Sequence, residues 1–221
     1  MTGAKIVALL IMPATEAYRR LGLACADDGF AVGGVAVKFT TDERPGLIAV
    51  GVAGATQLPD AVKAGGSFVV PPSGGLRRAE DHLKAELQTR PFPLKRLDHL
   101  ASVAYDLDAQ TRYWVDTLGV PLFGEVVAPT MVIRQFRLGD AIFELLGPNG
   151  EDSPIRKRSP GLISMASWEV DDLDAVVAQA RAAGFTPSDP AAGVLPGTRT
   201  ATIPATELGG VAMQLLQYVK R

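Results

Sequence analysis

Two stretches of the chain repeat the same order of hydrophobic and polar positions. The first runs from residue 97 to 109 and the second, weaker one from 164 to 175, and both pass from an apolar stretch typical of a strand into Asp-Leu-Asp-Ala. A helix-compatible run then follows and closes on a glycine, Gly119 in one copy and Gly184 in the other, as a helix C-terminus does. The repeat predicts one architecture used twice.

Further apolar segments complete each copy. Strands are expected near Val126 and at 131–138 and 141–146 in the first, and at 198–203 and 211–218 in the second, with a polar connector at 151–160. Asp106 and Asp172 are suited to cap the two helices. Each copy is therefore interpreted as a βαβββ unit. The fold predicted is α+β, with paired units forming one curved mixed sheet around a cleft.

The region before residue 92 shows its own alternation of elements. Strands are expected at 4–12, 30–40, 47–52 and 67–70, and helices at 14–22 and 57–63, with a bulge at Gly33-Gly34. A surface helix at 76–88 follows, and prolines at 91 and 93 end it. We therefore divide the chain into an N-terminal α/β region with a linker helix, 1–92, and a duplicated domain, 97–221. The N-terminal region is interpreted as a divergent third unit packed against the pair.

Composition narrows the classes of partner. A formal net charge of −2 and a pI near 5.7 favour small-molecule or protein partners over nucleic acid or an anionic membrane. The apolar run at 6–12 is too short to span a bilayer, which needs about 20 residues. The single cysteine, Cys25, excludes an intrachain disulfide and fits a cytoplasmic location. His82 lies among charged residues and is assigned no role.

Two polar residues stand out in the first unit. His99 lies in its first strand and Glu144 in its last, and alternation puts His99 on the same face as Ala101 and Val103. If both strands line one concave surface, the imidazole and the carboxylate meet there as metal ligands or as an acid–base pair. One of Arg134 and Gln135, which point to opposite faces, also reaches that surface.

On these motifs, residues 97–218 resemble the vicinal oxygen chelate superfamily, which includes glyoxalase I, methylmalonyl-CoA epimerase, extradiol dioxygenases and bleomycin-resistance proteins. The motifs that carry the resemblance are Asp-His-Leu-Ala at 98–101, Asp-Leu-Asp-Ala at 106–109, Trp-Val-Asp-Thr-Leu-Gly at 114–119, Phe-Glu-Leu-Leu-Gly-Pro at 143–148 and Trp-Glu-Val-Asp-Asp-Leu-Asp-Ala at 168–175.

The resemblance also implies where a metal would bind. Metal-dependent members place ligands on the first and last strands of both units, which here means His99, Glu144, Met165 and Gln214. Met165 stands where a histidine is usual, and a thioether is a poor ligand for divalent ions that prefer oxygen and imidazole. Gln214 stands where a glutamate is usual. A divalent metal is therefore disfavoured, although a three-ligand site of His99, Glu144 and Gln214 stays open.

Two functions follow from the resemblance. The first is an enzyme acting on a small oxygen-rich metabolite by isomerase, epimerase or lyase chemistry, with His99 and Glu144 as catalytic residues and Met165 and Gln214 as substrate contacts. The second is a metal-free protein that binds or sequesters a small molecule, as in the resistance branch, and the altered positions Met165 and Gln214 favour it. A small-molecule ligand and a homodimer are the partners implied.

Overall fold

The duplicated region forms an eight-stranded sheet. The computed structural model describes residues 3–11, 15–23, 25, 29–39, 47–53, 62–64, 67–70, 92–158, 161 and 163–219. The first unit consists of β7 (Arg96–Val103), α3 (Leu107–Arg112), a π-helical turn η1 (Tyr113–Thr117), β8 (Leu122–Val127), β9 (Met131–Leu138) and β10 (Ala141–Pro148). After a 3-10 turn, η2 (Pro154–Lys157), the second unit consists of β11 (Ile163–Glu169), α4 (Leu173–Ala182), β12 (Ala191–Ala192), β13 (Thr198–Ile203), a short 3-10 turn η3 (Ala205–Glu207) and β14 (Ala212–Tyr218).

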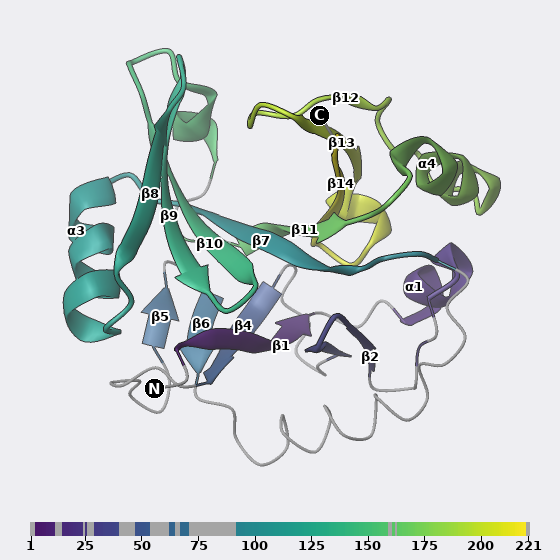
Figure 1. Ribbon diagram of the computed structural model, residues 1–221, viewed down its shortest axis with the longest axis horizontal. Helices are drawn as coiled ribbons and strands as arrows, with labels where there is room; N and C mark the ends of the chain where they lie inside the picture. The colour runs from purple at the N-terminus through teal and green to yellow at the C-terminus, as the bar shows by residue number, and fades with distance from the viewer. Residues whose placement is uncertain are drawn as a thin grey trace.

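Both units have the same strand connections. In each unit the first strand is parallel to the last, β7 to β10 and β11 to β14, and the remaining strands are antiparallel. The units join where β7 runs antiparallel to β11, giving the order β12-β13-β14-β11-β7-β10-β9-β8. Figure 1 shows the two halves rising on either side of β7 and β11. The predicted α+β fold, with two βαβββ units in one curved mixed sheet, is confirmed.

The two aspartates cap the helices as predicted. Asp106 Oδ1 accepts from the backbone N–H of Ala109 at 2.8 Å, and Asp172 Oδ1 accepts from that of Ala175 at 3.0 Å. The first helix begins at Leu107, directly after its cap, and widens into the π-helical turn before Gly119. Buried Trp114 in that turn packs on Phe143, with ring centroids 4.4 Å apart, and so anchors the helix to β10.

The N-terminal region forms a second sheet, of six strands. Its elements are β1 (Lys5–Ile11), α1 (Thr15–Leu21), β2 (Gly29–Val32), β3 (Val35–Phe39), β4 (Leu47–Ala53), β5 (Val62–Ala64) and β6 (Ser67–Val70). The strand order is β2-β3-β1-β4-β6-β5. In Figure 1 this sheet lies beneath the curled one.

The pairing within this second sheet repeats the plan of the first. β1 is parallel to β3, with β2 antiparallel to β3, and β4 is parallel to β6, with β5 antiparallel to β6. β1 and β4 meet antiparallel, as β7 and β11 do. The topology thus differs from a single divergent unit. The part of this region that the structure describes contains two shortened units, each with three strands where a βαβββ unit has four.

Two predictions for this region need correction. The strand expected at 30–40 is a hairpin, because Gly33 and Gly34 adopt positive φ angles of 56° and 83° and turn the chain between β2 and β3. A Cβ atom at Gly33 would lie 2.7 Å from the Cα of Arg96, so the turn also lets β7 approach. The prediction of a helix at 57–63 is wrong for its last two residues, 62 and 63, which belong to β5. Its earlier residues, and the predicted helix 76–88 with His82, lie outside the described residues.

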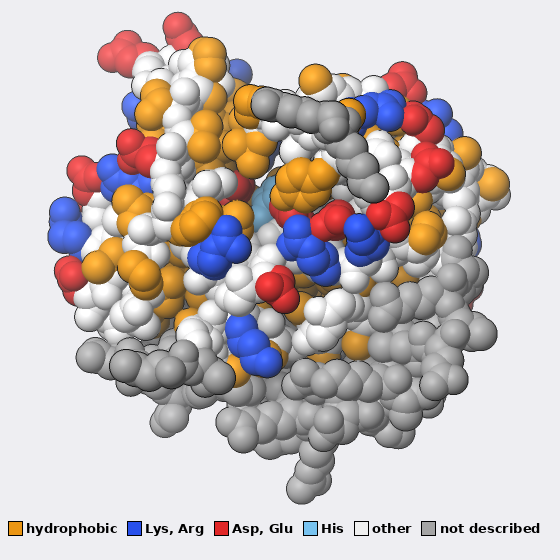
Figure 2. Space-filling view, viewed as in Figure 1, with side chains coloured by type: hydrophobic (Ala, Val, Ile, Leu, Met, Phe, Trp, Pro, Cys, Tyr) orange, Lys and Arg blue, Asp and Glu red, His pale blue; other side chains and the backbone are white. Residues whose placement is uncertain are grey.

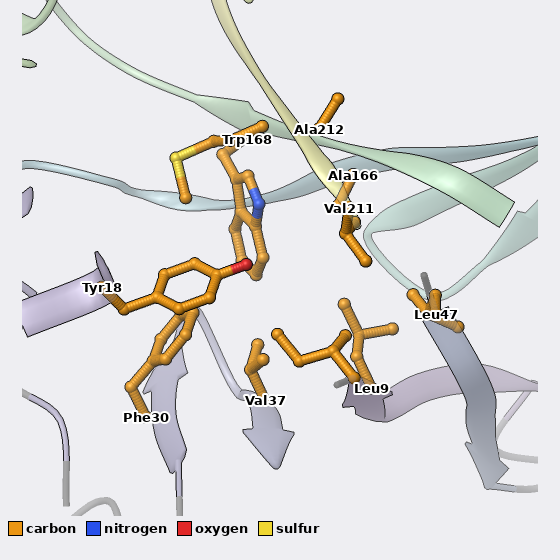
Figure 3. Close-up of a pocket in the computed structure, with 11 residues that line it drawn as sticks. Leu9, Tyr18, Phe30, Val37, Leu47, Ala166, Trp168, Val211 and Ala212 are labelled. Carbon is orange, nitrogen blue, oxygen red and sulfur yellow. The ribbon is translucent and has the colours of Figure 1, made fainter. Parts of the chain in front are cut away.

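The two sheets share one hydrophobic core. Phe30 from β2 lies against Trp168 from β11, with ring centroids 6.4 Å apart. A small apolar cavity remains between the sheets, and the Tyr18 hydroxyl points toward Trp168 there (Figure 3). Burial raises the pKa of Tyr18 well above its usual range, so this phenol stays neutral.

The division of the chain at 92–97 remains a prediction. No helix among the described residues is long and apolar enough to cross a membrane.

Candidate active site on the concave face

The register of the curled sheet places polar side chains in adjacent rows on its concave face. One row follows the paired residues Ser167, His99, Ile142 and Arg137 across β11, β7, β10 and β9. The next follows Met165, Ala101, Glu144 and Gln135. Figure 2 shows a hollow here, with a histidine side chain at its floor. The opposite face carries Phe136, Leu138 and Phe143, which belong to the core shared with the N-terminal sheet.

His99 is held at both ring nitrogens. Nδ1 lies 2.8 Å from Asp98 Oδ1, and Nε2 lies 2.8 Å from the hydroxyl of Ser167. Because a carboxylate only accepts, Nδ1 carries a hydrogen in this contact. The Ser167 hydroxyl has a single hydrogen, so it donates to one of its two neighbours and accepts from the other. Here it donates to Gln214 Oε1 at 2.6 Å.

Glu144 approaches the same ring nitrogen from the next row. Its Oε2 lies 4.0 Å from His99 Nε2, and its Oε1 accepts from Gln135 Nε2 at 2.8 Å. The side chains of His99 and Glu144 are only 12 % and 10 % exposed, so water screens little of the interaction between them. The structure therefore brings together the two residues predicted as catalytic and fixes one oxygen of Glu144, leaving the other turned to the imidazole.

Asp98 reaches His99 because of a β-bulge. Strict alternation would put adjacent residues on opposite faces of β7, but the register shifts between the pairs His99–Ser167 and Leu97–Trp168, which leaves Asp98 as the extra residue. Its Oδ2 accepts from Tyr218 at 2.8 Å and from Arg96 at 3.2 Å. Burial would raise the pKa of Asp98, but the hydrogen bonds from His99 and Tyr218 and the charge of Arg96 outweigh it and lower the pKa.

We expect Asp98→Asn to destabilise the protein by about 1–3 kcal/mol at pH 6, because three donors lose their charged acceptor. The folded-state pKa of Asp98 lies below its ordinary value of 3.8, so this contribution is present above pH 3.8 and is lost as the pH falls through the folded-state pKa. Urea unfolding of both proteins from pH 6 to pH 3 measures it. A difference that stays constant below pH 3.8 would contradict the assignment.

The two residues predicted as substrate contacts lie in different environments. The side chain of Gln214 accepts a hydrogen bond from Ser167, which also contacts His99. Met165 instead pairs in register with Ala101 and packs on an apolar cluster. We call this the concave apolar cluster; it consists of Ala101, Val103, Ile133, Leu146 and Ile155, with Val126, Met131 and Met165 packed against it. Whether Met165 and Gln214 contact a substrate remains a prediction.

Sequence reasoning missed Ser167 and Asp98. Alternation from Met165 places Ser167 on the same face, so the sequence contained a signal for it. The bulge that turns Asp98 toward His99 left no such signal, because it arises from the pairing of β7 with β11. Of the alternatives Arg134 and Gln135, the structure turns Gln135 to the concave face, and Arg134 instead binds Glu125 and Asp108.

The metal implied by the resemblance can be compared with this donor set. The Asp98 carboxylate orients the His99 ring as outer carboxylates orient metal-bound histidines, and a metal at Nε2 would take the place of the Ser167 hydroxyl. Glu144 Oε2 and the Gln214 amide oxygen are the other donors that fit a three-ligand site with open positions. Among the described residues, no group of three or more His, Cys, Asp or Glu side chains is arranged to hold a metal ion, so the third ligand would have to come from Gln214. His99, Glu144 and Gln214 would therefore hold the ion, and binding itself remains untested.

The fold of the duplicated region agrees with that of a known class of proteins. Residues 98–202 match the model of the Glyoxalase/Bleomycin resistance protein/Dioxygenase superfamily. The predicted resemblance of the duplicated region to the vicinal oxygen chelate superfamily is thereby confirmed. No curated protein shows significant similarity to the sequence.

Several solved structures are similar in fold to part of this chain. Methylmalonyl-CoA epimerase from Mycobacterium tuberculosis is 24% identical, with a TM-score of 0.53 over 60% of this chain and 94% of that one. A Streptomyces coelicolor methylmalonyl-CoA epimerase variant in complex with 2-nitronate-propionyl-CoA is 25% identical, with a TM-score of 0.50 over 57% of this chain and 99% of that one. A hypothetical protein from Bacillus halodurans is 21% identical, with a TM-score of 0.52 over 57% and 96%. Between 57% and 60% of this chain thus aligns with nearly the whole of each of these proteins.

Proposed function

We propose that the protein is an isomerase or epimerase that moves a proton at a carbon next to a carbonyl group of a small metabolite. The observation that carries the proposal is the convergence of Glu144 Oε2 and His99 Nε2, 4.0 Å apart and almost buried on the concave face. A base and a hydrogen-bond donor so placed can act on two neighbouring atoms of one substrate. Similarity to the Streptomyces coelicolor epimerase supports this type of chemistry.

The proposed step uses residues of this chain and a water molecule. The Glu144 carboxylate takes the proton from the carbon, and the electron pair of the broken C–H bond moves into the carbonyl group to give an enolate. Protonated at Nε2, His99 donates a hydrogen bond to the enolate oxygen, and the Asp98 carboxylate stabilises the ring charge. A water molecule on the opposite side of the enolate then protonates the carbon, which inverts its configuration, and Glu144 releases its proton to the solvent. A divalent metal held by His99, Glu144 and Gln214 would supply Lewis acidity at the substrate oxygen in place of the hydrogen bond from His99.

Exchange of the substrate proton with solvent tests the proposal. A coenzyme A thioester with an acidic α-hydrogen, such as methylmalonyl-CoA, is the first compound to try, because structures of similar epimerases contain such ligands. In D₂O the enzyme should replace the α-hydrogen with deuterium, as followed by NMR, with chelated protein and with added divalent ions compared in parallel. Tight binding without exchange under either condition would favour the alternative, a binding or sequestering protein. A homodimer also remains a prediction.

A further inference from the structure

The row that contains His99 ends on a cation without a carboxylate partner. Arg137 in β9 pairs with Ile142, which pairs with His99, so two strand spacings, roughly 10 Å, separate the backbone of Arg137 from that of His99. Phe136 and Leu138 on either side of Arg137 are buried in the core on the opposite face. Alternation therefore directs Arg137 to the concave face, toward the side that carries Gln135 and Glu144.

The arginine is free to bind a ligand. The Arg137 side chain makes no hydrogen bond or ion pair with any other described residue. Glu144 occupies the diagonal position across β9 and β10 but is held by Gln135 instead. The guanidinium lies over the ring of Phe123, 4.1 Å from its centroid. A stacked guanidinium keeps the N–H groups of its edge available, so the ring can hold the cation in place without consuming its donors.

The Phe123 side chain lies mostly outside the hydrophobic core. Its ring is 52 % exposed, and the residue lies where the register of β8 and β9 shifts, so a bulge turns it out of the regular alternation. Figure 2 shows hydrophobic and basic side chains together at the edge of the hollow. An exposed aromatic ring beside an unpaired arginine at the edge of a reactive site is suited to bind a ligand.

We infer that Arg137, supported by Phe123, binds an anionic group of the substrate, a carboxylate or a phosphate, while the carbon that reacts lies between His99 and Glu144. The inference rests on the proposed function for the position of the reacting carbon. The guanidinium edge matches the two oxygens of such a group. The concave apolar cluster begins in the Glu144 row and continues into the next row, that of Val103, Leu146 and Ile133, away from Arg137. It faces the less polar end of the molecule. The substrate class is thus an acidic metabolite whose opposite end is apolar.

Equilibrium binding of three small probes tests the inference without turnover. Propionate and propionamide differ in charge and little in shape, and inorganic phosphate represents the other anion. We expect the wild-type protein to bind propionate, phosphate or both roughly ten-fold more tightly than propionamide, as measured by NMR titration at constant ionic strength. Arg137→Gln should abolish that preference and Arg137→Lys should retain part of it. The anion that depends on Arg137 identifies the group recognised.

Arg112→Gln is the matched control, because Arg112 is exposed on α3 outside the concave face and its change removes the same charge. The preference should survive this change. Equal anion binding by wild-type and Arg137→Gln proteins would overturn the inference, as would an equal loss in the Arg112→Gln protein. Binding and deuterium exchange are separate readouts. Failure of the anion site therefore leaves the exchange result standing, and failure of exchange leaves the binding result standing.

Discussion

Replacing Glu144 with glutamine should lower the rate of deuterium exchange into the substrate by about 10²–10⁴-fold, the usual contribution of a general base. The amide keeps the shape of the side chain and an oxygen that accepts from Gln135, but it cannot take a proton. The fold should be retained, as judged by urea unfolding and circular dichroism. Rates measured at saturating substrate separate loss of the base from weaker binding.

Glu151→Gln serves as the control for Glu144→Gln, because Glu151 lies exposed in the turn after β10. The Glu151→Gln protein should exchange the α-hydrogen of the substrate at the wild-type rate. If Glu144→Gln also kept that rate, Glu144 would not be the base. If the Glu144→Gln protein unfolded, the Glu144 carboxylate would be needed for stability, as a partner of Gln135. The expected result is the opposite, a loss of activity with little loss of stability.

Replacing Trp168 with alanine should lower the free energy of unfolding by about 3–5 kcal/mol, the range for removing a large buried aromatic side chain. Trp168 is 2 % exposed and faces Phe30 across the two sheets. It also lines the apolar cavity between them, so its loss would enlarge an existing void (Figure 3). Urea unfolding followed by circular dichroism measures the effect without relying on tryptophan fluorescence.

Val194→Ala is the matched control for packing, because Val194 is 62 % exposed and its truncation should change stability by less than about 0.5 kcal/mol. Trp168→Phe should cost less than Trp168→Ala, since a smaller ring still fills part of the space. A loss below about 1 kcal/mol for Trp168→Ala would mean that the sheets do not depend on this contact.

The sequence by itself determined the duplicated architecture. Hydrophobic periodicity, the two Asp-Leu-Asp-Ala segments and the closing glycines are local signals, and the caps at Asp106 and Asp172 form as these signals predict. The same alternation placed His99 on one face of β7. A period of two decides the face as soon as one side of a strand is buried, so this part needed no tertiary information.

Other features were decided by pairing between distant strands. The bulge that joins Asp98 to His99 exists because β7 and β11 come from different units and meet with a shifted register. Gly33-Gly34 fits either a bulge or a hairpin turn, and the pairing of β2 with β3 selected the turn. The plan of two shortened units in the N-terminal sheet likewise appears only in the strand order.

The site shows the same division. Residue types marked His99 and Glu144, but the 4.0 Å approach of their side chains depends on β7 and β10 pairing in parallel with Ala101 opposite Glu144. Ser167 lies beside His99, and Arg137 lies in the same row two strands away, because register is a property of strand partners and no local sequence signal encodes it. Residue type and strand alternation therefore determined which residues face the hollow. Pairing between distant strands determined which of them meet there.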